Sequence, residues 1–174
     1  MNRLKLVLPT PAYKSKIMNY KREFILSEDR MYGTGGLKNA ESFNEWYIAF
    51  CNNLNEETVR KGLSSETTYL AVSTNDDNLV GMINIRHRLN DFLLNNGGHI
   101  DYSVRKSERR KGYAVEMLGL ALKECKRLNI KKVLITCDKN NIASAKTIIK
   151  NGAILENEIK KGNKISQRYW ISLE

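Results

Sequence analysis

The stretch VRKSERRKGYAVEML, residues 104–118, sets five basic side chains and a glycine directly ahead of an apolar pattern with helical spacing. The residues before it, NNGGHIDYSV (95–104), have the character of a strand that follows a turn. The residues after it, 114–130, repeat apolar side chains every three or four positions, as one face of a helix does. The stretch therefore predicts a strand that ends at Val104 and a turn over residues 107–111, with a helix beginning between Gly112 and Ala114.

Such a junction is suited to holding phosphate. The first turn of a helix exposes unpaired N–H groups and the positive end of the helix dipole. Gly112 lets the backbone approach a ligand closely, and Arg109, Arg110 and Lys111 add positive charge. Neither the GxGxxG pattern of dinucleotide sites nor the GxxxxGK[ST] pattern of nucleotide triphosphate sites occurs here. The junction is therefore predicted to hold a pyrophosphate by some other arrangement.

The rest of the chain divides into segments of helical and strand-like spacing. A glycine cluster at residues 32–36 separates the first two helices, either as a substrate lid or as a plain connection. A strand, a helix and a second strand in succession are the usual setting of a parallel crossover. The predicted helices cover residues 11–29, 41–55, 114–130 and 141–152, and the predicted strands cover 67–74, 79–89, 95–104, 131–138 and two runs within 153–173.

Length and hydropathy fit one globular unit. With 174 residues, 41% of them hydrophobic, we expect a single domain over residues 1–174. The segment 1–14 contains only a three-residue apolar run, which is too short for a signal peptide or a membrane-spanning helix. A cytoplasmic protein without a membrane partner is the expectation.

The cysteines and histidines argue against disulfides and metals. Cys51, Cys125 and Cys137 are odd in number and widely spaced, which predicts buried structural thiols in a reducing compartment. His87 and His99 have no cysteine partner at ligand spacing, so no metal is expected.

Positive charge gathers in the C-terminal part of the chain. The formal net charge is +10, and residues 101–174 hold 17 Lys and Arg against 8 Asp and Glu. This asymmetry fits a polyanionic partner, either nucleic acid or a phosphate-rich cofactor, and it also fits a solvated lysine-rich surface. Aromatic residues in this segment are scattered and form no base-stacking signature, which disfavours nucleic acid.

Two motifs at a suitable separation resemble those of one enzyme superfamily. RRKGYA, residues 109–114, resembles the [QR]-x-x-G-x-[GA] signature of the GNAT superfamily of acetyl-CoA-dependent N-acetyltransferases. NIAS, residues 141–144, followed by KNG at 150–152, resembles the N-x-x-[AS]…G pattern of a later helix in that family. The order of predicted elements resembles the family over about residues 12–173. The sequences of both motif regions and of the terminal RYW are similar to those of a bacterial group of predicted acetyltransferases.

The resemblance implies a fold and a set of contacts. The implied fold is a mixed α/β (α+β) arrangement, with a mostly antiparallel central sheet flanked by helices and a splayed strand pair at the acetyl-CoA site. The cosubstrate would be acetyl-CoA, whose three phosphates suit the basic segment. The implied cofactor contacts are the main chain of Tyr102 and Val104, the pyrophosphate cradle Arg109, Arg110, Lys111, Gly112, Tyr113 and Ala114, and the pantetheine-binding Asn141.

The implied chemistry is direct attack of an acceptor amine on the thioester, with no covalent enzyme intermediate. Many family members place a tyrosine seven residues after the asparagine to protonate the leaving thiolate, but here that position is Ile148. Ser144 is the nearest hydroxyl, and it serves either the leaving group or the start of its helix. His99 and Asp101 are the nearest candidates for a general base, with a water relay as the alternative.

Several alternatives remain open from the sequence. The acceptor is a small amine, a peptide N-terminus or a lysine side chain, and nothing in the near-neutral N-terminal segment selects among them. A domain that binds acyl-CoA without catalysis and, less favoured, a basic nucleic-acid-binding module are the competing functions. A homodimer that pairs through its terminal strands is a further expectation.

Overall fold

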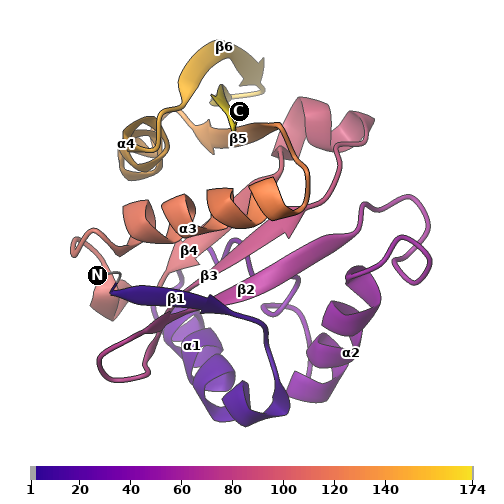
Figure 1. Ribbon diagram of the computed structural model, residues 1–174. Coiled ribbons are helices and arrows are strands. Elements are labelled where there is room, and N and C mark those ends of the chain that lie inside the picture. Colours follow the sequence, from indigo (N-terminus) through magenta and orange to yellow (C-terminus); the bar gives the residue numbers. More distant parts are fainter. Residues whose placement is uncertain (1–2, 174) are drawn as a thin grey trace.

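The computed structural model describes residues 3–173, which form two antiparallel β-sheets with helices around them (Figure 1). The first sheet has the strand order β1-β2-β3-β4, and the second has the order β5-β7-β6. The strands are β1 (Leu4–Val7), β2 (Glu66–Ser73), β3 (Leu79–Arg86), β4 (Ile100–Val104), β5 (Lys132–Asp138), β6 (Ile154–Lys161) and β7 (Lys164–Ser172). The helices are α1 (Lys14–Leu26), α2 (Phe43–Asn53), α3 (Tyr113–Arg127) and α4 (Ile142–Lys150), with short helical segments at Pro11–Tyr13, Leu93–Gly97 and Lys106–Glu108.

The four-stranded sheet is covered on both faces. Helices α1 and α2 pack on one face and α3 packs on the other, with α4 and the second sheet beyond α3 (Figure 1). Alternation along β3 sends Met82 into the core under α1, while Ile83 and Ile85 join the core under α3. The sheet therefore separates two cores, and the larger one joins α3, α4 and both sheets.

The predicted fold class is confirmed, with three local differences. Strand β1 was missed, because its four residues show too little alternation to be recognised in the sequence. The predicted strand 95–104 begins only at Ile100, since residues 93–97 form a short helical segment. The exposed thiol of Cys51 corrects the expectation that all three cysteines are buried, whereas Cys125 and Cys137 are buried as predicted. Within residues 3–173, no helix is both long and apolar enough to cross a membrane.

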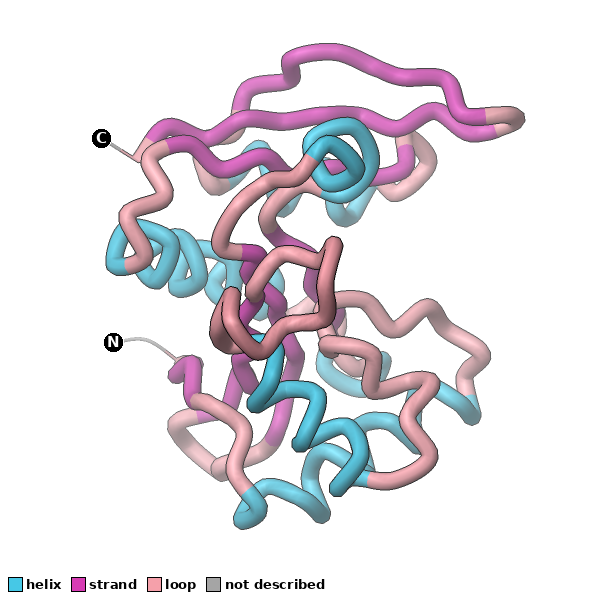
Figure 2. The backbone as a smooth tube through the Cα atoms, turned by 90° about the vertical axis from the view of Figure 1, so that its right-hand side faces the viewer, coloured by secondary structure: helices cyan, strands magenta, loops and turns pink. Residues whose placement is uncertain are grey.

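Within residues 3–173, the main chains of the two sheets are bonded to each other at one place. Strands β4 and β5 lie in different sheets, and they do not form the parallel ladder expected of a crossover. They are linked instead by an isolated antiparallel bridge between Gly98 and Ile135, just before β4 begins. A Cβ atom at Gly98 would lie 2.5 Å from the Leu134 carbonyl oxygen, and the φ angle of Gly98 is +77°, so glycine is required for this close approach. Figure 2 shows the hairpin of β6 and β7 along one end of the molecule.

His99 completes this junction. Its N–H donates to the Leu134 carbonyl at 2.7 Å, and its ring Nδ1 accepts from the Leu134 N–H at 3.0 Å. Burial lowers the pKa of His99 to about 4, and the nearby positive charge of Arg86 adds to this effect. The neutral imidazole therefore joins the two sheets.

A second brace ties the start of the chain to α3. The Glu116 carboxylate accepts from the backbone N–H groups of Arg3 at 2.6 Å and Leu4 at 2.9 Å. The Arg3 guanidinium pairs with the same carboxylate at 3.0 Å and donates to the Lys111 carbonyl at 2.9 Å. The edge strand β1 is thereby fixed to the first turn of α3.

The His99 junction predicts a loss of stability in acid. The folded-state pKa of about 4 lies below the ordinary value of 6.5, so the unfolded chain binds more protons between these two values. The free energy of unfolding should therefore fall as the pH drops from about 6.5 to about 4, by on the order of 3 kcal/mol from this group. Urea unfolding at pH 7.5 and pH 4.5 measures this loss. It should shrink in His99→Gln, whereas an equal loss in wild type and variant would contradict the assignment.

Candidate functional site

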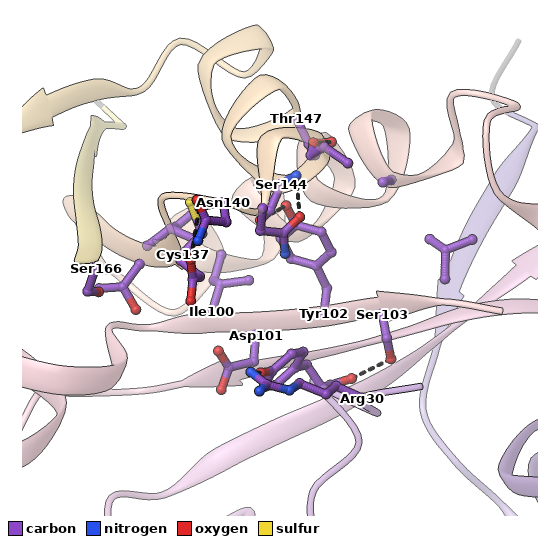
Figure 3. Close-up of a pocket in the computed structure, with 18 of the residues that line it drawn as sticks. Arg30, Ile100, Asp101, Tyr102, Ser103, Cys137, Asn140, Ser144, Thr147 and Ser166 are labelled. Carbon is purple, nitrogen blue, oxygen red and sulfur yellow. Dashed lines mark hydrogen bonds between the residues drawn. The ribbon is translucent and has the colours of Figure 1, made fainter. Parts of the chain in front are cut away.

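A cleft of about 1320 Å³ opens where β4 and β5 diverge (Figure 3). Its walls come from β4, β5, the first turns of α3 and α4, the loop after α1, and the turn between β6 and β7. Ligand pockets for small molecules commonly measure about 300–1,000 Å³, so this cleft has room for a long ligand and for a second molecule beside it.

The edge of β4 presents free main-chain groups to the cleft. Ladder bonds run from the Arg86 N–H to the His99 carbonyl at 2.8 Å and from the Arg105 N–H to the Val80 carbonyl at 3.0 Å. Because bonding alternates along an antiparallel strand, the main-chain groups of Tyr102 and Val104 face away from β3. Both residues line the cleft. The Val104 carbonyl accepts from the Arg109 Nε at 3.0 Å, which joins the strand end to the turn that follows.

The turn into α3 carries a row of unpaired donors. Arg110 and Gly112 have left-handed φ angles of 62° and 82°, which orient successive N–H groups outward. None of the backbone N–H groups of residues 110–115 has a hydrogen-bond acceptor among residues 3–173. The Glu23 carboxylate anchors the preceding segment, accepting from the Ser107 N–H at 2.9 Å. The turn is therefore a preformed site for an anion.

The predicted cradle residues are mostly brought together. Arg109, Arg110, Gly112, Tyr113 and Ala114 line the cleft, whereas the side chain of Lys111 turns away and pairs with Glu108 at 2.9 Å. Arg109 is held by Asp29 at 2.9 Å.

Across the cleft, α4 contributes Asn141 and Ser144. The Asn141 Oδ1 accepts from the Ser144 N–H at 3.1 Å, so asparagine caps this helix. The Ser144 hydroxyl instead bonds the Tyr102 hydroxyl at 2.9 Å, as Figure 3 shows. Burial raises the pKa of Tyr102 to about 12. The phenol therefore stays protonated at neutral pH and remains a hydrogen-bond donor.

Ile148 and Cys137 lie on either side of the boundary between the cleft and the larger core. Ile148 is fully buried in the larger core and does not line the cleft, so the position that carries a tyrosine in many relatives is part of the packing here. Cys137 lies on the cleft wall, where burial raises the pKa of its thiol to about 11. A thiol with this pKa is a poor nucleophile at neutral pH.

The two candidate bases lie in different environments. Asp101 lines the cleft on the face of β4 opposite Tyr102, and its carboxylate pairs with the Arg86 Nη2 at 2.5 Å. His99 does not line the cleft, and its Nδ1 is already bonded to Leu134. Only Asp101 is therefore placed beside a substrate.

Sequence reasoning missed the side-chain role of Tyr102, which was predicted only for its main chain. Alternation along β4 could have placed its ring opposite Asp101, but the contact with Ser144 joins segments 42 residues apart. It also missed Arg30 and Cys137, because their place on the cleft depends on how loops and strands pack.

The comparisons with known proteins agree with this arrangement. The family model described as acetyltransferase (GNAT) domain matches residues 3–154. The chain therefore belongs to the GNAT family of acetyltransferases. It is accordingly an acetyl-CoA-dependent N-acetyltransferase, as the members of this family are. No curated protein matches the sequence significantly.

Solved structures show the same fold at low identity. A GNAT-family acetyltransferase from Bacillus anthracis is 19% identical with a TM-score of 0.67, over 98% of this chain and 95% of that chain. A dodecameric spermidine N-acetyltransferase from Vibrio cholerae is 14% identical with a TM-score of 0.68, over 99% and 95%. A microcin C7 self-immunity acetyltransferase in complex with acetyl-CoA and AMP is 14% identical with a TM-score of 0.68, over 99% and 94%.

The anion site in the turn predicts the effect of changes at Gly112. In Gly112→Val, a branched side chain would crowd the N–H groups and strain a backbone with φ of 82°, so acetyl-CoA affinity should fall at least tenfold. Gly112→Asn is the control that separates crowding from backbone strain, because asparagine tolerates the left-handed region but still adds a side chain beside the N–H groups. Calorimetry with acetyl-CoA measures the affinity, and thermal unfolding checks the fold. Normal binding by Gly112→Val would place the phosphates elsewhere.

Proposed function

We propose that the protein transfers the acetyl group of acetyl-CoA directly to a primary amine of an acceptor. The observation that carries this proposal is the row of free N–H groups at residues 110–115, which opens onto the same cleft as the unpaired edge of β4. The pyrophosphate would bind the turn of residues 109–114, and the pantetheine would run between β4 and β5 past Asn141. This geometry supports catalysis over a purely cationic surface for nucleic acid.

The main chain of β4 would act on the thioester. The Tyr102 and Val104 main-chain groups face the space between the strands, where an N–H group would stabilise the oxyanion that forms as the amine attacks. The attacking nitrogen becomes positively charged and must lose a proton. Asp101 would take this proton, directly or through water, and His99 is not retained in this role because its Nδ1 is engaged.

The leaving thiolate would meet the hydroxyl pair of Ser144 and Tyr102. The Ser144 hydroxyl would donate a hydrogen bond to the sulfur as the carbon–sulfur bond breaks, while Tyr102 donates to Ser144. The thiolate then takes up a proton by way of these hydroxyls and water. The products are the acetylated amine and free CoA, because the proton lost by the attacking nitrogen balances the one that the thiolate takes up.

Thiol release from acetyl-CoA across a panel of amines and peptides tests this function. With an acceptor found in that panel, Ser144→Ala and Tyr102→Phe should each lower kcat several-fold with little change in acetyl-CoA affinity, because the interaction is confined to the transition state. Ser166→Ala is the matched control, because it removes a hydroxyl that lines the cleft from β7, and it should retain kcat. Binding of acetyl-CoA without thiol release from any amine would favour the non-catalytic acyl-CoA-binding alternative.

We also propose that the protein acts in the cytoplasm as a homodimer. Strand β6 is the outer edge of the second sheet, and Ile154 and Leu155 on it are 75% and 45% exposed. Glu156 and Glu158 precede Lys160 and Lys161 on this strand, so two antiparallel copies can set opposite charges side by side. Sedimentation should give about twice the mass of one chain, and Ile154→Asp should weaken the dimer. A monomer at every concentration would contradict the proposal.

A further inference from the structure

The part of the cleft outside the turn at residues 109–114 forms its other end, and cations from separate elements line it. Arg30 comes from the loop after α1, Arg86 comes from β3, and Lys161 and Lys164 flank the turn between β6 and β7. If acetyl-CoA occupies the other end as proposed, this end is where an acceptor would enter. Its charge therefore bears on what the acceptor is.

The carboxylates at this end are already engaged. Asp101 pairs with the Arg86 guanidinium at 2.5 Å, and that guanidinium also donates to the Gly98 carbonyl at 3.2 Å. The Asp138 Oδ1 accepts from the Asn140 N–H at 2.9 Å, and the carboxylate faces the positive charge of Arg30. Asp29, next to Arg30 in the chain, also lines the cleft and pairs with Arg109 at 2.9 Å, so a polycationic acceptor would find little free negative charge to bind it.

Three of the cations have no carboxylate partner among residues 3–173. The Arg30 guanidinium donates to the Tyr32 hydroxyl at 3.1 Å, and the Lys161 ammonium donates to the Asn95 carbonyl at 3.2 Å. Lys164 has neither kind of partner within those residues. Arg86 pairs with both Asp101 at 2.5 Å and Glu66 at 3.9 Å. Four cations, Arg86, Arg30, Lys161 and Lys164, therefore face three acids, Asp101, Glu66 and Asp138, so this end carries a positive excess.

We infer that the acceptor is an amine that also carries an anionic group, a carboxylate or a phosphate, and that Arg30 and Lys164 bind this group. The inference rests on the proposed function, because it assumes that acetyl-CoA fills the end of the cleft near α3. The amine would lie at Asp101, on the same side of β4 as Arg30 (Figure 3). A guanidinium and an ammonium together suit an oxyanion, since one donates a fixed fork of hydrogen bonds and the other a mobile charge.

Calorimetry on the protein saturated with CoA tests this inference without turnover. Phosphoethanolamine and β-alanine are the probes, because each carries an amine and an anionic group. Ethanolamine, which lacks an anionic group, and spermidine, a polycation, are the controls. Saturation with CoA would fill the turn at residues 109–114, so a phosphate-bearing probe would report binding at the other end of the cleft. We expect at least one anionic probe to bind tenfold or more tightly than ethanolamine and spermidine. Whichever of the two probes binds identifies phosphate or carboxylate as the preferred group.

Arg30→Ala and Lys164→Ala should each weaken the anionic probe at least threefold and leave CoA binding unchanged. Arg127→Ala is the matched control, because its side chain is 75% exposed on α3, pairs with Glu124 and does not line the cleft. The inference would be overturned if spermidine or ethanolamine bound as tightly as the anionic probes, or if neither anionic probe bound. It would also be overturned if Arg30→Ala and Lys164→Ala bound the anionic probe as tightly as wild type. Failure of CoA itself to bind would instead refute the proposed function.

Discussion

The contact of Gly98 and His99 with Leu134 is the constraint on which the site depends. It holds the two sheets together at one point, and from there β4 and β5 separate. If the strands stayed paired, the main-chain groups of Tyr102 and Val104 would bond β5 and no cleft would form. Residue 98 must lack a side chain, and residue 99 must offer an uncharged acceptor, because each approaches the Leu134 backbone closely. A buried imidazole meets the second need as long as it stays neutral.

The alternation of β4 divides the cleft between two tasks. Tyr102 faces α4 and the hydroxyl of Ser144, whereas Asp101 faces the opposite side, with Arg86 and Arg30. In the proposed mechanism, adjacent residues of one strand would therefore serve the leaving group and the incoming amine from opposite directions. A direct displacement needs such an arrangement, since nucleophile and leaving group both bond to the same carbon during the reaction.

The sequence predicted the fold well wherever periodicity was strong, as in α3, whose apolar face runs from Met117 to Cys125. The turn at residues 109–114 was predicted from a different local signal, a glycine directly before the start of a helix. The sequence could not show that the ring of His99 bonds the Leu134 backbone, because that partner belongs to a strand 35 residues away. Strand β1 was likewise missed because it depends on a distant partner, the Glu116 carboxylate, which accepts from the Leu4 N–H. The pairing of Lys111 with Glu108 is local, but the sequence alone did not show that it directs Lys111 away from the cleft.

The carboxylate of Glu116 has a consequence for recognition. It accepts from the Arg3 and Leu4 N–H groups, and Arg3 in turn donates to the Lys111 carbonyl, so the edge strand fixes the turn at residues 109–114 from behind. A loop that is ordered before its ligand arrives loses less conformational entropy on association. The basic side chains around the turn can then raise the association rate of an anionic ligand, because the turn already has its binding geometry when the ligand arrives.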